Sequence, residues 1–382
     1  MRQFLFVFSI ILLVYGCLNY YIGRRLWQTL SFYVSLNHSL YWLIFWSVAL
    51  SYLMGRMGEK YLPAGVSTLL SLVGSYWLGA MFYFLQILVV MDLIRALMNV
   101  LKLWPGGVKG FPPAAGLTAL LLVIVILGYG FWNARNPQVV HYDITIPKKA
   151  GQLDKLHVVM VSDLHLGKIM DNRRLEKMVE IVNALNPDLI LLPGDVIDEN
   201  VGLFVEQNMM ATFRRLNPKY GKFAALGNHE YIGRKVEEAI HYLEESGIQV
   251  LRDSYIKVED SFYVVGRDER ASERFSGRKR KSLAEVMTGI DYSLPIILLN
   301  HQPVELEEAK KEGVDLQLSG HTHRGQLFPN QLITSRIFEK DWGYLRKEEL
   351  QVIVSSGFGT WGPPIRVGNR PEVVDIVIHF SP

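Results

Sequence analysis

The sequence has almost no cysteine and, over its first third, almost no charge. Cys17 is the only cysteine among 382 residues, so no disulfide can form within the chain. Residues 1–133 carry eight basic and two acidic side chains, a net charge of +6, whereas residues 134–382 carry 32 basic and 35 acidic ones, a net charge of −3. The overall charge of +3 therefore describes neither part, and it disfavours a nucleic-acid partner recruited by a basic surface.

Apolar stretches take the place of the missing charge in the first part. A helix needs about 20 apolar residues to cross a bilayer, because in lipid every backbone amide must be satisfied within the segment. Four stretches reach or approach this length, and they cover residues 4–22, 36–55, 66–91 and 114–132. They predict a transmembrane helical bundle of about four spans over residues 1–133, held in a lipid bilayer. The Pro- and Gly-rich residues 105–113 read as a loop before the last span.

The loop charges barely decide the orientation of these spans. With four spans, the N-terminus and the large C-terminal part lie on one side of the membrane. Five basic residues then fall in the first and third loops, against four in the segments that flank the spans on the other side. The numbers of basic residues therefore do not decide on which side of the membrane the C-terminal part lies.

From about Tyr142, short β-branched runs alternate with amphipathic helices, which indicates an α/β domain with its helices outside one or two sheets. We expect a linker and first strand over residues 134–153 and the domain itself over residues 154–382. The further expected strands cover residues 156–162, 188–193, 222–226, 248–251, 261–265, 295–300, 314–318, 351–355 and 373–378. The clearest expected helices cover residues 172–185, 235–245 and 304–311.

Five short polar clusters each follow the end of an expected strand. They are Ser162-Asp163-Leu164-His165, Gly194-Asp195-Val196-Ile197-Asp198, Gly227-Asn228-His229-Glu230, Asn300-His301 and Gly320-His321-Thr322-His323. Taken singly, most of these would be surface turns or core histidines. Open α/β sheets bind ligands at the carboxyl ends of their strands, so together the clusters predict one site. They supply four imidazoles, two carboxylates and one Asn carbonyl as candidate ligands, a set that suits two divalent transition metals better than Ca²⁺ or a thiolate zinc site.

In this order, the five clusters resemble the calcineurin-like metallophosphoesterase family over roughly residues 154–379. Residues Gly325-Gln326 and Ser355 to Arg366 resemble its membrane-anchored, multi-span bacterial branch. The resemblance implies two packed β-sheets flanked by helices. It also implies one metal held by Asp163, His165, Asp195 and His323, and a second held by Asp195, Asn228, His301 and His321. Manganese is the expected metal, and the ligand set also admits iron or zinc.

The resemblance further implies a chemistry that needs no Ser or Cys nucleophile. A water that bridges both metals would attack phosphorus in line with the leaving oxygen. His229 would protonate the leaving oxygen or stabilise phosphoryl charge, and Asp198 would orient His229.

The sequence also departs from one branch of this family. The protein serine/threonine phosphatases have Arg directly after the second Asp of Gly-Asp-x-x-Asp, where this chain has Glu199. Arg324 and Arg366 are the candidates to bind substrate phosphate in its place. The charge run from Arg267 to Lys281 is either a solvated loop or a rim that attracts an anionic substrate.

These observations predict a membrane-anchored, binuclear-metal phosphoesterase that hydrolyses phosphomonoester, phosphodiester or pyrophosphate bonds, with lipid-linked substrates among the candidates. Because the resembling branch works mostly outside the cytoplasm, we expect a multi-pass protein of the cell membrane with its catalytic domain on the extracytoplasmic face. The alternative is a non-catalytic receptor or scaffold that keeps the metal-binding fold.

Overall fold

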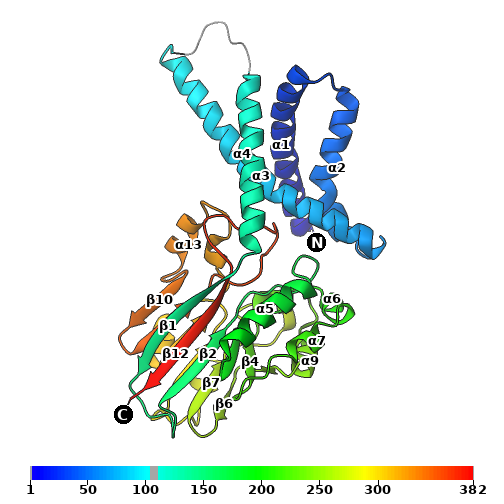
Figure 1. The fold of residues 1–382 in the computed structure, drawn as a ribbon. Helices are drawn as coiled ribbons and strands as arrows, with labels where there is room; N and C mark the ends of the chain where they lie inside the picture. Colours follow the sequence, from blue (N-terminus) through cyan, green and yellow to red (C-terminus); the bar gives the residue numbers. More distant parts are fainter. Residues whose placement is uncertain (1, 104–110, 382) are drawn as a thin grey trace. The chain divides into compact units, whose positions relative to one another are not determined.

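The computed structural model describes residues 2–103 and 111–381, so most of the loop expected over residues 105–113 lies outside the described residues. The chain divides into two compact units (Figure 1). The helical unit comprises Met1–Phe131 together with Gly362–Ile365. The α/β unit comprises Trp132–Trp361 and Arg366–Pro382.

Four helices form the helical unit: α1 (Arg2–Tyr33), α2 (His38–Met57), α3 (Ala64–Val100) and α4 (Pro113–Ala134), whose last residues pass into the α/β unit. Among the described residues, α1 from Phe6, α3 and α4 are long and apolar enough to cross a membrane. The count of four spans is therefore not confirmed. Helix α2 has the length, but Ser, Tyr and Trp residues interrupt its apolar run, and it is not among these three helices.

Small residues allow α2 and α3 to pack closely. A Cβ on Gly55 would lie 2.6 Å from Ser71 Oγ, and a Cβ on Gly74 would lie 2.2 Å from the backbone nitrogen of Tyr52. Ser67 Oγ donates a hydrogen bond to the carbonyl of Gly55. Such contacts hold helices together in lipid, where the hydrophobic effect contributes little between them.

The first sheet of the α/β unit has the strand order β1-β12-β2-β3-β4-β5. Its strands are β1 (Gln138–Ile146), β2 (Lys155–Met160), β3 (Leu189–Pro193), β4 (Lys222–Ala225), β5 (Gln249–Val250) and β12 (Glu372–Phe380). Strands β2 to β5 run parallel, and β12 pairs antiparallel with β2. The carboxyl ends of β2, β3 and β4 therefore meet at one edge of the sheet.

The second sheet has the order β10-β11-β9-β8-β7-β6. Its strands are β6 (Ser254–Val258), β7 (Phe262–Gly266), β8 (Ile296–Leu299), β9 (Leu316–Ser319), β10 (Gly343–Lys347) and β11 (Leu350–Val354). Strands β7, β8, β9 and β11 run parallel. The two outer strands run antiparallel to their neighbours: β6 pairs with β7, and β10 pairs with β11.

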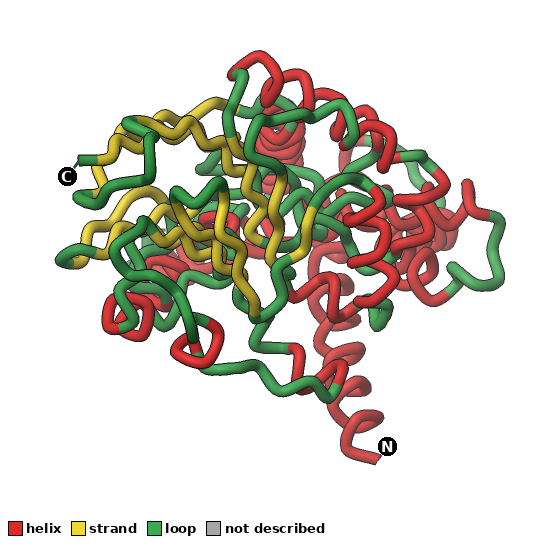
Figure 2. Tube along the Cα trace, turned by 90° about the horizontal axis from the view of Figure 1, so that it is seen from below, coloured by secondary structure: helices red, strands yellow, loops and turns green. Residues whose placement is uncertain are grey.

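The two sheets pack face to face, with helices on both outer faces. Figure 2, with strands in yellow, shows the sheets as neighbouring layers. A core of fully buried apolar residues such as Val158, Leu191 and Ile297 fills the space between them. Outside the first sheet lie α5 (Asn172–Leu185), α6 (Val201–Glu206), α7 (Met209–Phe213) and α9 (Val236–Glu245), and outside the second lie α11 (Leu283–Val286) and α12 (Leu306–Lys311). The expected two-sheet α/β fold is confirmed.

Each strand expected from residue 156 onward has a counterpart within a few residues, but the sequence reading missed β6 and β10. Both are edge strands, and most of their residues are only half-buried or exposed. A strand paired on one side needs fewer apolar side chains than a central strand, so its sequence signal is weak.

Candidate metal centre

Five loops at the carboxyl ends of parallel strands bring the predicted residues together. The loops after β2, β3 and β4 carry Asp163, Asp195 and the short helix α8 (Asn228–Ile232), and those after β8 and β9 carry His301 and His321. Side chains from both sheets therefore meet at one edge of the sandwich, as expected for an α/β fold.

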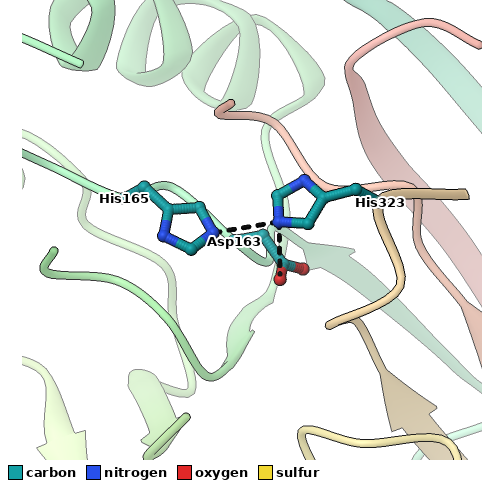
Figure 3. Close-up of side chains that lie close together, drawn as sticks. All are labelled: Asp163, His165 and His323. Carbon is teal, nitrogen blue, oxygen red and sulfur yellow. Dashed lines mark hydrogen bonds and ion pairs between the residues drawn. The ribbon is translucent and has the colours of Figure 1, made fainter. Parts of the chain in front are cut away.

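The first group of side chains contains Asp163, His165 and His323 (Figure 3). The Nε2 atoms of His165 and His323 are 3.0 Å apart, and His323 Nε2 lies 3.5 Å from Asp163 Oδ1. All three residues are buried. Burial lowers the pKa of His165 to about 4, so its imidazole is neutral at neutral pH and can offer a lone pair to a cation.

The second group contains Asp195, His301 and His321. His301 Nε2 lies 3.2 Å from Asp195 Oδ2, 3.3 Å from His321 Nδ1 and 3.3 Å from Asn228 Oδ1. His301 Nδ1 donates to the carbonyl of Pro193 at 2.9 Å, which fixes its ring and turns Nε2 towards the group. Burial and the charge of His301 lower the pKa of His321 to about 3.

Asp195 faces both groups. Its Oδ2 atom is 3.2 Å from His301 Nε2 and 3.8 Å from His165 Nε2, while its Oδ1 accepts a hydrogen bond from the backbone of His229 at 2.8 Å. Burial would raise the pKa of Asp195, but the neighbouring His301 outweighs this effect and holds that pKa well below its usual range. This carboxylate is therefore ionised and lies between two sets of nitrogen donors.

The loops adopt a backbone conformation that their residue types disfavour. Five of the converging residues have left-handed φ angles: Asp163 at 53°, His165 at 48°, Asp195 at 52°, His321 at 68° and His323 at 47°. Each such residue costs on the order of 1–3 kcal/mol and persists only where the surroundings enforce it, and strain of this kind gathers at functional sites.

Two glycines allow the loops to approach one another. Gly194 has φ of +90°, and a Cβ there would lie 2.4 Å from His301 Nδ1. A Cβ on Gly320 would lie 2.1 Å from Asp163 Oδ2. Any larger residue would displace a member of the metal groups.

His229 lies beside both groups and is held by Asp198. Its Nδ1 atom is 2.7 Å from Asp198 Oδ1, and its ring centroid is 4.5 Å from that of His165. Burial alone would lower the pKa of His229, but the hydrogen bond to Asp198 and the nearby carboxylates raise it to about 9. His229 therefore carries a proton at neutral pH and can act as a general acid.

The donor atoms fit two divalent cations. They are imidazole nitrogens, carboxylate oxygens and an amide oxygen, without a thiolate, which suits Mn, Fe or Zn.

The two predicted substrate-binding arginines occupy different environments. Arg324 places its guanidinium 3.9 Å from the ring centre of Trp342 and is only half-buried. Arg366 is fully buried and donates to the carbonyls of Gly357 and Gly359. Its Nη2 atom also lies 3.2 Å from His323 Nδ1. This geometry favours a positioning role for Arg366 over direct contact with substrate, while the prediction for Arg324 stays open.

Glu230 is a residue to which the sequence analysis gave no role. Its buried carboxylate accepts hydrogen bonds from the backbone nitrogens of Asp195 at 3.3 Å, Ile197 at 2.9 Å and Gly227 at 2.8 Å. It thereby ties the loop after β3 to the start of α8. Glu230 stands three residues after the N-cap Gly227 of α8, where a glutamate side chain commonly accepts a hydrogen bond from the N-cap backbone. This spacing is the sequence signal that could have identified its role.

The charged residues from Arg267 to Lys281 are partly buried and paired, so they do not form only a solvated loop or only a surface rim for an anionic substrate. Arg267 and Asp268 are buried: Arg267 pairs with Glu308 at 2.9 Å, and Asp268 pairs with Arg252 at 3.0 Å. Arg280 donates to Asn300 Oδ1 at 2.9 Å, directly before His301. Part of the run thus supports the loop that carries a metal-group histidine.

Comparison with known proteins agrees with this geometry. The family model described as calcineurin-like phosphoesterase matches residues 156–325. An uncharacterized metallophosphoesterase of Aquifex aeolicus is 35% identical over 266 residues, which cover 68% of this chain and 98% of that protein. A transmembrane protein with metallophosphoesterase domain from Danio rerio is 33% identical over 272 residues, which cover 68% of this chain and 62% of the Danio rerio protein. The chain thus spans less than two thirds of that relative.

Among solved structures, a dimetal phosphatase from Danio rerio aligns with a TM-score of 0.37 at 14% identity, covering 59% of this chain and 99% of that one. At this TM-score the alignment carries no argument about function. The Aquifex aeolicus relative and the matching family model carry the assignment. The chain belongs to the calcineurin-like metallophosphoesterase family.

Proposed function

We propose that this chain is a membrane-anchored, binuclear-metal phosphoesterase that hydrolyses phosphomonoester, phosphodiester or pyrophosphate bonds. The observation that carries the proposal is the position of Asp195, whose Oδ2 atom faces His301 on one side and His165 on the other. Two cations held close together need an anionic group between them, and an ionised carboxylate meets that need.

Asp163, His165, Asp195 and His323 would hold one metal, and Asp195, Asn228, His301 and His321 the other. When bound, the two cations supply Lewis acidity and an activated water for attack at phosphorus. Manganese is the first candidate, with iron and zinc as alternatives. The buried surroundings of these residues limit the water around the reacting phosphate.

His229 would deliver the proton that the leaving oxygen needs. Because Nδ1 is engaged by Asp198 at 2.7 Å, Nε2 is the atom left to face the substrate. Asp198 keeps the ring in this orientation and stabilises its charged form. A positioned proton donor of this kind contributes roughly 10²–10⁴-fold to the rate.

The test uses the full chain in detergent with Mn²⁺ and bis-p-nitrophenyl phosphate. We expect turnover by the wild type and a loss of at least about a hundredfold in Asp195→Asn and His229→Ala. His241→Ala is the matched control, because His241 is an exposed histidine on α9 that pairs only loosely with Glu245 at 3.5 Å. Undiminished turnover in Asp195→Asn or His229→Ala would refute the mechanism. Metal binding without turnover on any phosphate ester would instead support the receptor or scaffold alternative.

We further propose that the α/β unit lies on the extracytoplasmic face of a multi-pass cell-membrane protein. The experiment places single cysteines at Leu30, Lys60 and Phe275 in a Cys17→Ser background, because Cys17 is the only native thiol. A membrane-impermeant thiol reagent should label Phe275→Cys in intact cells. Labelling of that position only after lysis would place the unit in the cytoplasm.

A further inference from the structure

Most of the exposed large apolar side chains of the α/β unit gather on two short stretches of the chain. Among its described residues, the exposed large apolar side chains are Trp132, Ile232, Tyr292, Phe328, Leu332, Ile333, Ile337 and Trp361. Three of them lie on the short helix α13 (Gln331–Ile337), which has no buried residue at all. We call Phe328, Leu332, Ile333, Ile337 and Trp361 the α13 patch. A concentration of this kind marks an interaction surface.

One residue from each of these two stretches lies near the metal centre. The ring of Trp361 lies 6.0 Å from that of His229, and the ring of Phe338, which follows α13, lies 6.2 Å from that of His321. Gln326 joins the two parts, since its side chain donates to the carbonyl of Trp361 at 2.8 Å and accepts from the nitrogen of Trp361 at 2.9 Å. The α13 patch is therefore continuous with the candidate active site.

The chain itself connects this patch to the helical unit. Gly362–Ile365, the residues directly after Trp361, belong to the helical unit. Within that unit, a Cβ on Gly79 would lie 2.9 Å from Ile365 Cδ1 and 3.3 Å from Pro363 Cβ, so this segment packs against α3. Trp361 directly precedes this segment in the chain, and consecutive Cα atoms are about 3.8 Å apart.

One basic residue of the patch helix suits the surface of a membrane. Arg336 is exposed on α13, whereas Lys340, further along the chain, lies between Glu339 and Asp341. Basic side chains next to Leu, Ile and Trp are typical of segments that lie in the interface between lipid headgroups and acyl chains.

We propose that the bilayer surface covers the α13 patch and that the substrate is an amphiphile, with its phosphate ester at the metal centre and its apolar chain along the patch. The substrate part rests on the proposed phosphoesterase function, whereas the membrane contact does not. A second copy of this chain is the competing occupant.

The membrane contact is tested on the full chain in lipid nanodiscs. Spin labels are attached at Ile333→Cys or Ile337→Cys in the Cys17→Ser background, with Tyr292→Cys as the control because Tyr292 is similarly exposed but lies outside the patch. We expect the two patch labels to be more accessible to oxygen than to a water-soluble nickel chelate, and the control label to show the reverse. Patch labels that favour the nickel chelate, or that are shielded from both reagents as in a protein–protein contact, would overturn the proposal.

The substrate class is tested with two esters that release the same p-nitrophenolate. Hexadecyl p-nitrophenyl phosphate in phosphatidylcholine vesicles is compared with soluble bis-p-nitrophenyl phosphate. The double variant Ile333→Glu/Ile337→Glu should lose at least about tenfold in kcat/KM for the alkyl ester and keep its turnover of the soluble ester, because a carboxylate on the patch would lose its hydration against acyl chains. Tyr292→Glu should change neither.

The outcomes separate the two proposals. If the wild type hydrolyses neither ester, the phosphodiesterase form of the proposed function and the amphiphilic diester substrate both fail, and the spin-label result still decides the membrane contact. If the double variant hydrolyses both esters at wild-type rates, the amphiphile proposal is wrong while the phosphoesterase function stands.

Discussion

Gly194 offers the sharpest test of how the loops are assembled. An alanine Cβ at this position would lie 2.4 Å from His301 Nδ1, where φ is +90°. Gly194→Ala should therefore strain the backbone and push the His301 ring away from the carbonyl of Pro193, to which it is bonded at 2.9 Å. The strain costs about 1–3 kcal/mol and the lost hydrogen bond about 1 kcal/mol, for a total of about 2–4 kcal/mol.

Gly277 supplies the matched control, because its φ is +73° but a Cβ there meets no atom within 4 Å. At about 2–4 °C per kcal/mol for a unit of this size, Gly194→Ala should lower the apparent Tm by about 5–15 °C, and Gly277→Ala, which bears backbone strain without a clash, should lower it by less. Gly194→Ala should also bind less Mn²⁺, measured by elemental analysis, while Gly277→Ala binds as much as the wild type. Equal Tm shifts and equal metal content in both variants would refute the assigned packing of Gly194 against His301.

Two further predictions concern buried cations. Arg366→Met should destabilise the α/β unit by about 3–5 kcal/mol in thermal unfolding, because the carbonyls of Gly357 and Gly359 lose their charged donor. Arg366→Lys should not restore the lost stability, since an ammonium lacks the guanidinium fork. Lys222 Nζ donates to three carbonyls at 3.0–3.1 Å, so Lys222→Met should cost about 2–4 kcal/mol in the same assay. Lys235→Met, which removes only an exposed pair with Glu238, should stay within about 1 kcal/mol of the wild type, and a loss equal to that of Lys222→Met would contradict the reasoning.

The central strands and the order of the site loops could be predicted from the sequence because they follow from local patterns. Strand β3 consists of five buried residues, and such a run predicts a strand covered on both faces. Parallel strands bring their carboxyl ends to one edge, so the clusters around Asp163, Asp195 and His301 could be expected to meet.

The rest depends on contacts between distant segments. The burial of Arg366 against His323 joins positions 43 residues apart, and nothing local to Arg366 indicates it. The left-handed conformation of Asp163 is likewise imposed by its surroundings, since aspartate alone rarely adopts it. The division that places Gly362–Ile365 with the helical unit could not be read from the sequence either, because it depends on packing against α3.

Metal content per chain tests the central claim most directly. The full chain, purified with Mn²⁺ and analysed for metal by elemental mass spectrometry, should hold two ions in the wild type and in Asp198→Asn, because we assign the Asp198 carboxylate to His229 and not to a metal. Asp195→Asn should hold at most one, because Asp195 is the group that faces both sets of donors. A wild type that binds no metal, or an Asp195→Asn variant that keeps both ions, would contradict the account.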